Sequence, residues 1–171
     1  MERTRQQALF DEWFRLHQGL VGRILRAYAF TAHDRDDLLQ ELALQLWKSI
    51  PLFRGESKVT TWIYRVGLRT ALAWSQRERA RREEAEPLAE PGAVLAPVPL
   101  ESDPRLDWIY ARIARLEPVD RSLILLHLDG LSQREIAETL GIREGNVGVK
   151  LGRIKKSMAS ESPERVRDGL R

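Results

Sequence analysis

One stretch near the C-terminus constrains the fold more than any other part of the chain. Residues 132–158 read SQREIAETLGIREGNVGVKLGRIKKSM. Ser132 and Glu135 have the S-x-x-E spacing of a capping box, and Gly141 can supply the positive φ of a tight turn. An apolar stripe at helical spacing lies on each side of that glycine: Ile136, Ala137 and Leu140, then Val147, Leu151, Ile154 and Met158. The stretch therefore predicts two short helices joined as a helix-turn-helix.

The second helix of this motif is predicted to expose a face suited to duplex DNA. With its apolar stripe buried, it presents an amide, a small apolar group and several cations, from Arg143, Asn146, Val149, Lys150 and Arg153. Such groups fit base edges and phosphates in a major groove, although an ordinary helical hairpin with a solvated basic face is the alternative. Gly145, Gly148 and Gly152 each cost about 1 kcal/mol relative to alanine inside a helix. Either packing holds this helix, or the glycines permit close approach of its backbone to DNA.

Composition limits the classes of protein to which the chain can belong. Its 171 residues suffice for one domain of moderate size or two small ones, and its net charge of +3 permits a nucleic-acid partner without requiring one. The absence of cysteine excludes disulfides and thiolate metal sites. No stretch approaches 18 consecutive apolar residues, and the N-terminus lacks the apolar core of a signal peptide. We expect a cytoplasmic protein with no membrane insertion.

Two amphipathic helices are predicted at the start of the chain. The first, residues 4–30, can bend at Gly19 or Gly22 and turns one apolar face inward: Leu9, Trp13, Leu16, Leu20 and Ile24. The second, residues 34–50, follows an N-cap at Thr31 or Asp34 and buries Leu38, Leu42 and Leu46. Its polar residues form either a solvated face or a partner surface, between which the sequence does not decide: Asp37, Gln40, Glu41 and Gln45.

A third helix, predicted over residues 58–85, interleaves cations with aromatic and hydroxyl side chains. Its cations are Lys58, Arg65, Arg69, Arg77, Arg79, Arg81 and Arg82, and the side chains between them include Thr61, Trp62, Tyr64 and Trp74. Cations neutralise phosphates and aromatic faces accept unstacked bases, so the mixture indicates single-stranded or melted nucleic acid. At least two of the aromatic residues are expected in the core, which makes the basic run at the helix end the firmer indication.

A proline-rich segment divides the chain. Residues 87–104 contain five prolines, and residues 83–103 contain six acids without Lys or Arg. This pattern is typical of an extended linker and predicts a domain at 1–86, a linker at 87–103 and a domain at 104–171. In the second domain one helix carries Leu106, Ile109, Ile113 and Leu116, and the next is expected to bury Leu123, Ile124, Leu126 and Leu128. The predicted fold class is all-α, with two small helical domains.

Nothing in the sequence indicates a catalytic or metal site. His17, His33 and His127 are scattered, and neither H-E-x-x-H nor P-loop spacing occurs. We therefore predict a protein that is not an enzyme and needs no metal or cofactor.

Four segments, in this order, resemble the extracytoplasmic-function sigma factors of bacteria. They are residues 36–41 (DDLLQE) with Leu46 and Trp47, residues 53–57 (FRGES) followed by 61–65 (TWIYR), residues 116–118 (LEP), and residues 130–132 (GLS) through Gly141 and Ile142. The combination is much more specific than any one segment.

The resemblance implies a partner for each surface. The coiled coil of the β′ subunit of core RNA polymerase would bind Asp37, Gln40 and Glu41. The β subunit of the same enzyme is also an implied partner. Melted bases of the −10 promoter element would be held by Phe53, Arg54, Lys58, Thr61, Trp62, Arg65 and Arg69. The duplex −35 element would be bound by Arg143, Asn146, Val149, Lys150 and Arg153. An anti-sigma factor is the implied regulator.

Departures from the family pattern leave promoter preference open. Members often have asparagine at the position of Arg69 and aspartate at that of Ala73, and their recognition helix often reads TVKSRL where this chain reads NVGVKL. One alternative is a sigma mimic that titrates an anti-sigma factor without binding promoters. Another is a stand-alone helix-turn-helix regulator, which would leave the first 86 residues without a role. The acidic surface at Asp37 and Glu41 favours polymerase docking over both.

Overall fold

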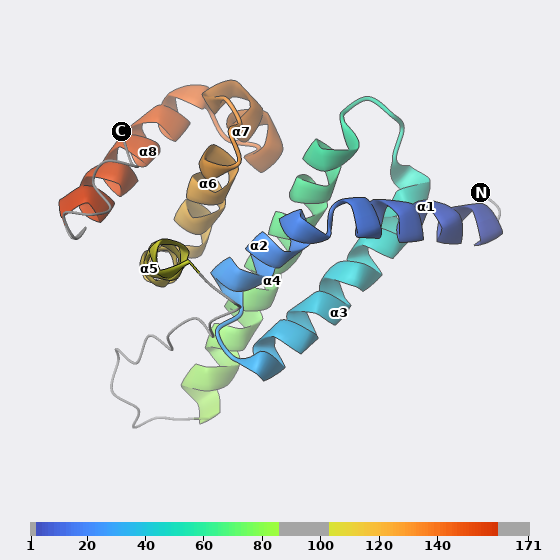
Figure 1. The fold of residues 1–171 in the computed structure, drawn as a ribbon, viewed down its shortest axis with the longest axis horizontal. Helices are drawn as coiled ribbons and strands as arrows, with labels where there is room; N and C mark the ends of the chain where they lie inside the picture. The colour runs from blue at the N-terminus through green and yellow to red at the C-terminus, as the bar shows by residue number, and fades with distance from the viewer. Residues whose placement is uncertain (1–2, 86–102, 161–171) are drawn as a thin grey trace. The chain divides into compact units, whose positions relative to one another are not determined.

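The structure is a computed structural model that describes residues 3–85 and 103–160, and these residues form helices and turns only (Figure 1). The all-α class predicted from the sequence is therefore confirmed. The chain divides into two compact units, one built from α1 to α4 and the other from α5 to α8. The predicted linker lies, apart from Asp103, outside the described residues, so its boundaries remain predictions. None of the described helices is long and apolar enough to cross a membrane.

The N-terminal unit is organised around the pairing of its two longest helices. Its elements are α1 (Arg3–Leu16), α2 (Gln18–Tyr28), α3 (Ala32–Ser49), the 3-10 helix η1 (Ile50–Leu52) and α4 (Val59–Ala85). Helices α3 and α4 lie along each other, and α2 packs against both (Figure 1). The predicted inward face of α3 is confirmed, since Leu38, Leu42 and Leu46 are all buried.

The prediction of one continuous helix over residues 4–30 was wrong. The chain leaves helical geometry at His17, with φ −114° and ψ 19°, so that α1 and α2 are separate helices. Because this break changes the helical register, Leu16 does not join the buried stripe that continues at Leu20, and it is 62% exposed. Gly19 and Gly22 both lie inside α2 and do not mark the break.

Helix α3 begins at a capping box that also fixes the far end of α4. The Asp34 amide donates to Thr31 Oγ1 at 3.0 Å, and the Thr31 amide donates to Asp34 Oδ2 at 3.2 Å. The helix therefore starts at Ala32, two residues before the predicted start. The same Asp34 carboxylate is buried and accepts two hydrogen bonds from Arg82 near the end of α4.

The C-terminal unit contains α5 (Pro104–Ile113), α6 (Pro118–Leu128), α7 (Gln133–Leu140) and α8 (Glu144–Ser160). The predicted capping box is confirmed: the Glu135 amide donates to Ser132 Oγ, and the Ser132 amide donates to Glu135 Oε2. Gly141 ends α7 with φ 69°, in the left-handed region that glycine tolerates. The stripe predicted for the next helix is also buried, at Val147, Leu151, Ile154 and Met158.

Two residues that the helical pattern assigns to the apolar faces of these helices lie at the surface of the unit. Leu128 is the last residue of α6 and is 46% exposed, while Leu125, which was not singled out, is buried. Leu106 is exposed in the first turn of α5, whose buried side is made by Tyr110 and Ile113. Both errors fall at helix termini, where the periodic pattern extends past the region that neighbouring helices cover.

Candidate nucleic-acid and protein interfaces

Helix α3 carries the predicted acidic surface on one side. Gln40 is exposed, and Asp37 and Glu41 are half-buried. Asp37 Oδ2 lies 3.3 Å from His33 Nε2, one turn earlier. Glu41 Oε1 accepts a hydrogen bond from Gln45 Nε2 at 3.1 Å and lies 3.7 Å from Arg77 Nη2 of α4. The structure thus brings the three predicted residues to one face and holds Glu41 through neighbours on two helices.

An exposed leucine that the sequence analysis missed lies on the same face, one turn after Gln40 and Glu41. Leu44 is 45% exposed, three residues after Glu41 and four after Gln40, so all three share one side of the helix. An exposed apolar side chain ringed by polar ones is typical of a protein interface rather than of a nucleic-acid interface. Its position could have been found by asking which apolar residue of α3 does not fit the inward stripe of Leu38 and Leu42.

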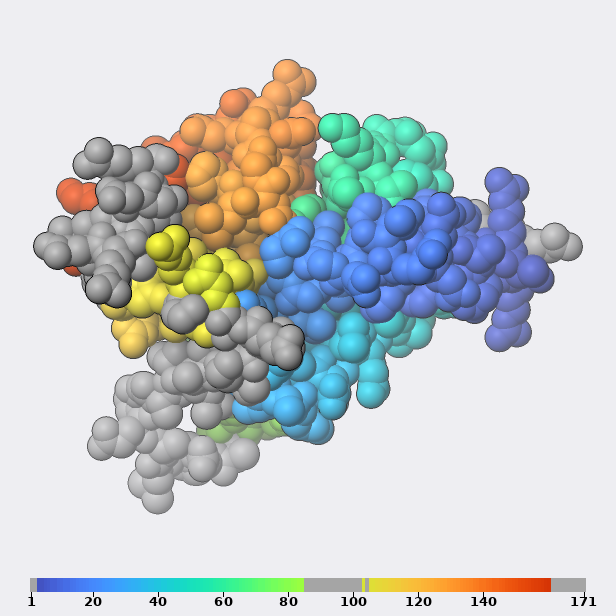
Figure 2. Space-filling view, in the orientation of Figure 1, coloured from blue at the N-terminus to red at the C-terminus, as the bar shows by residue number. Residues whose placement is uncertain are grey.

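Helix α4 brings most of the predicted −10 residues onto one stripe. Lys58 directly precedes the helix, and Thr61 and Trp62 follow three and four residues after it. Arg65 comes one turn after this pair, and Arg69 four residues after Arg65. Lys58, Arg65 and Arg69 are exposed, as is Arg54 in the turn that leads into the helix. Gly55 permits that turn with φ 75°. The surface of the turn around Gly55 and the start of α4 adjoins the surface of α1 (Figure 2). The stripe has the cationic character that binding a phosphate backbone requires.

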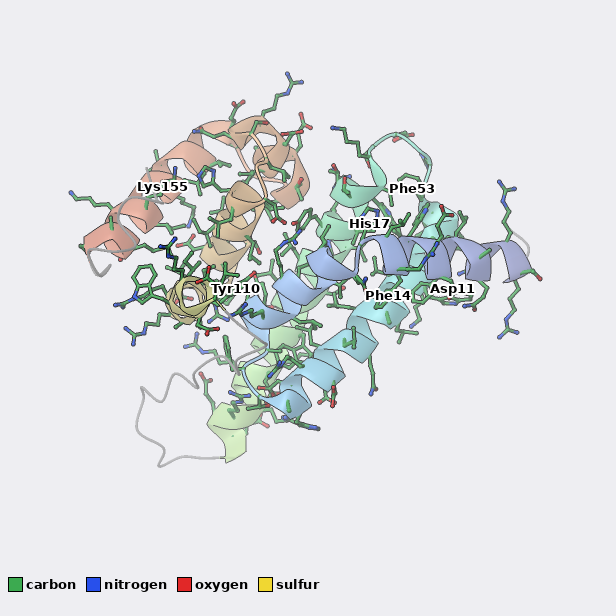
Figure 3. All side chains as sticks on the ribbon, viewed as in Figure 1. Asp11, Phe14, His17, Phe53, Tyr110 and Lys155 are labelled. Atoms are coloured by element: carbon green, nitrogen blue, oxygen red, sulfur yellow. The ribbon has the colours of Figure 1, made fainter. Side chains whose placement is uncertain are left out.

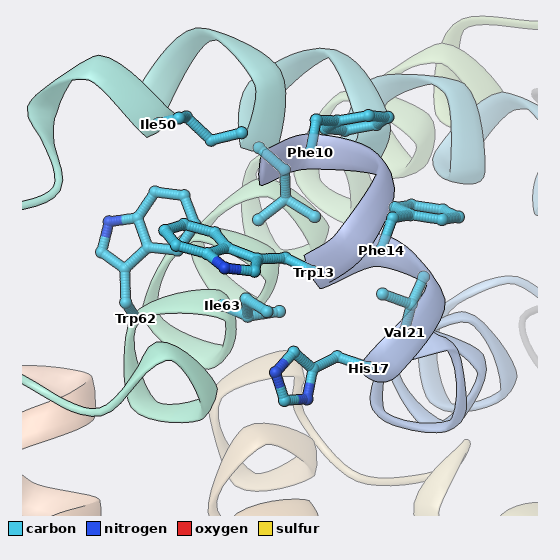
Figure 4. A pocket seen from close by; sticks show the side chains of 9 residues that line it. Phe10, Trp13, Phe14, His17, Val21, Ile50, Trp62 and Ile63 are labelled. Carbon is cyan, nitrogen blue, oxygen red and sulfur yellow. The ribbon is translucent and has the colours of Figure 1, made fainter. Parts of the chain in front are cut away.

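The two predicted aromatic contacts are half-buried in a cluster rather than freely exposed. The ring centroids of Trp13, Phe53 and Trp62 lie 5.2 to 5.4 Å apart, with edge-to-face or tilted geometry. Phe53 lies before α4 (Figure 3), and its ring meets both tryptophans from there. Beside the cluster is an apolar hollow between α1 and α4, in which Trp13 faces Trp62 and His17 lies at the margin (Figure 4). Packing therefore fixes the position of the aromatic edges that a base could meet.

The basic run at the end of α4 does not form a free cationic surface, contrary to the sequence prediction. Each of its arginines has a carboxylate partner: Arg77 with Glu41, Arg79 with Glu83, Arg81 with Glu78, and Arg82 with Glu78 and Asp34. Burial tends to raise the pKa of Asp34, but hydrogen bonds from Arg82 and Thr31 and the charge of Arg82 outweigh it and lower the pKa. Arg77 and Arg82 therefore connect α4 to α3, whereas Arg79 and Arg81 pair within α4.

Helix α8 exposes four of the predicted −35 residues on two adjoining sides, and the fifth, Arg143, directly precedes the helix. Val149 is 58% exposed on the side opposite the buried stripe, and Arg143, Asn146 and Arg153 are exposed as well. Lys150 differs from them, because its Nζ lies 2.7 Å from Asp120 Oδ1 of α6 and its side chain is 41% exposed. The sequence could not reveal this pair, since 30 residues separate its members.

The three glycines of α8 have different surroundings. A Cβ at Gly148 would lie 2.8 Å from Oε1 of Gln133, so this glycine makes room for a side chain of α7. A Cβ at Gly145 or Gly152 would meet no atom within 4 Å. Internal packing therefore accounts for Gly148 only, and the other two leave a low, open surface on either side of Val149.

The described residues contain no group of three or more His, Asp or Glu side chains placed to hold a metal ion. His127 lies on α6, and its pKa is lowered because burial disfavours the charged ring and Lys155 of α8 repels it. The lowered pKa of His127 follows from the packing of α6 against α8. The arrangement offers surfaces for binding, with cations and aromatic edges in one unit and a helix-turn-helix in the other.

Comparison with known proteins assigns each unit to a family. Residues 13–82 match the family model of sigma-70 region 2, and residues 106–158 match that of sigma-70 region 4. Together the two matches span most of the described residues, in the order that the sequence segments predict.

Relatives that match most of this chain are ECF RNA polymerase sigma factors. The ECF RNA polymerase sigma factor SigM of Mycobacterium tuberculosis is 26% identical over 152 residues, which cover 88% of this chain and 75% of the relative. The ECF RNA polymerase sigma-E factor of Haemophilus influenzae is 26% identical over 94% of this chain and 92% of its own length. A solved structure from Bartonella quintana, the sigma factor RpoE in complex with the anti-sigma factor NepR, matches with a TM-score of 0.71 at 16% identity. That match covers 88% of this chain and 94% of the other, and it concerns the fold.

Proposed function

The chain belongs to the extracytoplasmic-function sigma factors of the sigma-70 family, and on this premise we propose that it directs RNA polymerase to promoters. In this role it binds core RNA polymerase, recognises the −10 and −35 elements and promotes initiation of transcription. Sigma factors are DNA-binding regulators, so the role needs binding surfaces rather than a catalytic site.

One observation carries the proposal. The α4 stripe and the helix-turn-helix of α7 and α8 occur in a single chain, in the family's order, and each exposes cations. A stand-alone regulator would use the second surface and have no use for the first. We propose residues 1–86 and 104–171 as the two functional domains, joined by residues 87–103.

We propose the α3 face as the site that docks on the β′ subunit. Asp37, Gln40 and Glu41 supply polar and charged contacts, and Leu44 adds an apolar side chain to bury beside them. A mixed face of this kind suits a protein partner, because buried apolar area provides affinity while charges set orientation.

We propose the α4 stripe as the site for the melted −10 strand. Arg54, Lys58, Arg65 and Arg69 would contact the phosphate backbone, since all four are exposed cations along one path. Phe53, Thr61 and Trp62 would meet the bases. The exposed edges of the two aromatic residues are held still by their own cluster, which reduces the entropy lost on binding.

We propose α8 as the element that enters the major groove of the −35 duplex. Arg143, Asn146, Arg153 and Lys150 would contact bases or phosphates, and Val149 would lie nearest the groove floor. The open surface at Gly145 and Gly152 would let the helix backbone approach the DNA closely.

An anti-sigma factor is the proposed regulator of this chain. The support is a likeness in fold to the Bartonella quintana sigma factor, whose structure contains its anti-sigma factor NepR. A partner of this kind would compete for the α3 face or for the DNA-binding surfaces.

Transcription on a randomised template tests the proposed function. Bacterial core RNA polymerase is incubated with the full chain and a library of templates with randomised upstream sequence, and the RNA products are sequenced. We expect transcripts that depend on the chain and share two upstream motifs. The Arg143→Ala variant should alter the upstream motif and leave the downstream one intact. Core polymerase binding without any such transcripts would favour a sigma mimic.

A further inference from the structure

The ion pair between Lys150 and Asp120 connects the proposed DNA-reading helix to the body of its own unit. Lys150 Nζ lies 2.7 Å from Asp120 Oδ1, with side-chain exposures of 41% and 25%. A charge-assisted hydrogen bond of this length is among the stronger kinds that side chains make. It joins α8 to α6, two helices that also pack through their apolar faces.

The position of Lys150 on its helix explains the contact. Lys150 follows Val149 and precedes the buried Leu151, so it lies at the flank of α8 next to α6, and the exposed Arg153 lies further round the helix. Asp120 meets it from the first turn of α6, where the helix dipole favours a negative charge. The carboxylate is therefore well placed to hold the ammonium group.

We propose that Asp120 is a positioning residue that acts as an internal substitute for phosphate and restrains Lys150 on the α6 side of the recognition helix. This inference rests on the proposed function of α8. A DNA phosphate must displace the Asp120 carboxylate before it can interact fully with the charge of Lys150. Binding of α8 to DNA of arbitrary sequence is therefore weakened. Asp120 thereby lowers the affinity of the helix-turn-helix for DNA of any sequence.

The test measures affinity for DNA of no particular sequence. The full chain is titrated into a fluorescein-labelled duplex of mixed sequence over a series of KCl concentrations, and anisotropy gives the dissociation constant. We expect Asp120→Asn to bind about two- to fivefold more tightly at low salt, the range that corresponds to a half-exposed ion pair. The slope of the logarithm of its dissociation constant against the logarithm of the KCl concentration should steepen by about the amount that one phosphate contact contributes.

Two comparisons separate the restraint from a general change in charge. Glu117→Gln removes the same charge from the exposed start of α6, and it should leave affinity and salt dependence near wild type. In a Lys150→Ala background, Asp120→Asn should have no further effect. An equal gain in that background, or a gain from Glu117→Gln as large as that from Asp120→Asn, would overturn the inference.

Side-chain NMR tests the contact without DNA. The Lys150 ammonium resonance should shift and exchange faster with water in Asp120→Asn and in Asp120→Ala, and circular dichroism should show that both variants remain folded. An unchanged resonance in both variants would show that the pair does not form and would overturn the inference. Binding that is equal in wild type and Asp120→Asn would overturn it while leaving the proposed function intact. Absence of DNA binding by every variant would also overturn the inference, whereas the transcription experiment with core RNA polymerase decides the proposed function separately.

Discussion

Arg82 Nη2 donates to both carboxylate oxygens of Asp34, at 3.1 Å and 2.9 Å, across 48 residues of sequence. Asp34 is also the N3 residue of the capping box that starts α3, so one buried carboxylate serves a helix terminus and a contact between helices. Four of the five tryptophans lie in the same unit, at positions 13, 47, 62 and 74. Their fluorescence can therefore follow the unfolding of α1 to α4.

Replacing Arg82 by methionine should destabilise the N-terminal unit by about 1–3 kcal/mol, because the buried Asp34 carboxylate loses its cationic partner. Urea unfolding followed by tryptophan fluorescence measures this change. Arg79→Met is the matched control, since Arg79 and Glu83 form an exposed pair one turn away, and it should change stability by less than about 0.5 kcal/mol. Equal effects of the two substitutions would contradict the role given to Asp34.

The stability of the same unit should depend on pH through Asp34. The folded pKa of this carboxyl is below its ordinary value of 3.8, so protonation disfavours the folded state. Its contribution to the free energy of unfolding is complete above the unfolded pKa, and it is lost as pH falls through the lowered folded pKa. Urea unfolding at successive pH values should show this loss in wild type. Asp34→Asn should have a flatter profile over the same acidic range, and a profile parallel to wild type would refute the assignment.

His127 should titrate below its ordinary pKa of 6.5 in the folded protein, because burial and the charge of Lys155 both disfavour the protonated ring. The unfolded chain binds this proton more readily, so stability should fall as pH decreases from about 6.5 to the folded pKa, with no further loss below it. NMR titration of the His127 ring gives the folded pKa. Lys155→Met should move it upward, while Lys156→Met, at the neighbouring exposed position, should change it less. Equal shifts in the two variants would contradict the assigned cause.

The same glycine-to-alanine change should have opposite effects in α8 and α4. Gly152→Ala should stabilise the C-terminal unit by about 0.5–1 kcal/mol, since alanine favours helix and the added Cβ meets no atom within 4 Å. Gly67→Ala should destabilise the N-terminal unit by about 1 kcal/mol, because its Cβ would lie 2.9 Å from Cδ1 of the fully buried Ile24. Thermal unfolding of each variant measures both effects. Stabilisation by both would show that Ile24 moves aside readily.

Local patterns predicted the helices and their capping well. The Ser132 capping box, the left-handed Gly141 and the buried stripe from Val147 to Met158 all depend on residues a few positions apart, and all were confirmed. The errors came where tertiary packing decides. Leu128 continues an apolar period past the point at which a neighbouring helix covers it, and Leu16 precedes the break at His17, so the period alone overestimates the core.

Contacts between distant residues account for the rest of what the sequence could not predict. The sequence pattern predicted that the arginines at the end of α4 form an unpaired cationic surface. Their partners nevertheless include Glu41 and Asp34, which lie more than 30 residues earlier. Lys150 likewise read as a fully exposed cation, but it pairs with Asp120. Charge patterning along one helix identifies cations and gives no information on which of them another helix neutralises.

We propose above that the α3 face docks on core RNA polymerase. Binding of the labelled full chain to purified bacterial core RNA polymerase, followed by fluorescence anisotropy, tests it most directly. Asp37→Arg/Glu41→Arg reverses the acidic face, and Glu83→Arg/Glu84→Arg makes the same charge change on an exposed part of α4 as the control. We expect tight binding by wild type and by the control, and loss of binding by the α3 variant. No binding by folded wild-type protein, or equal binding by the α3 variant, would contradict the account.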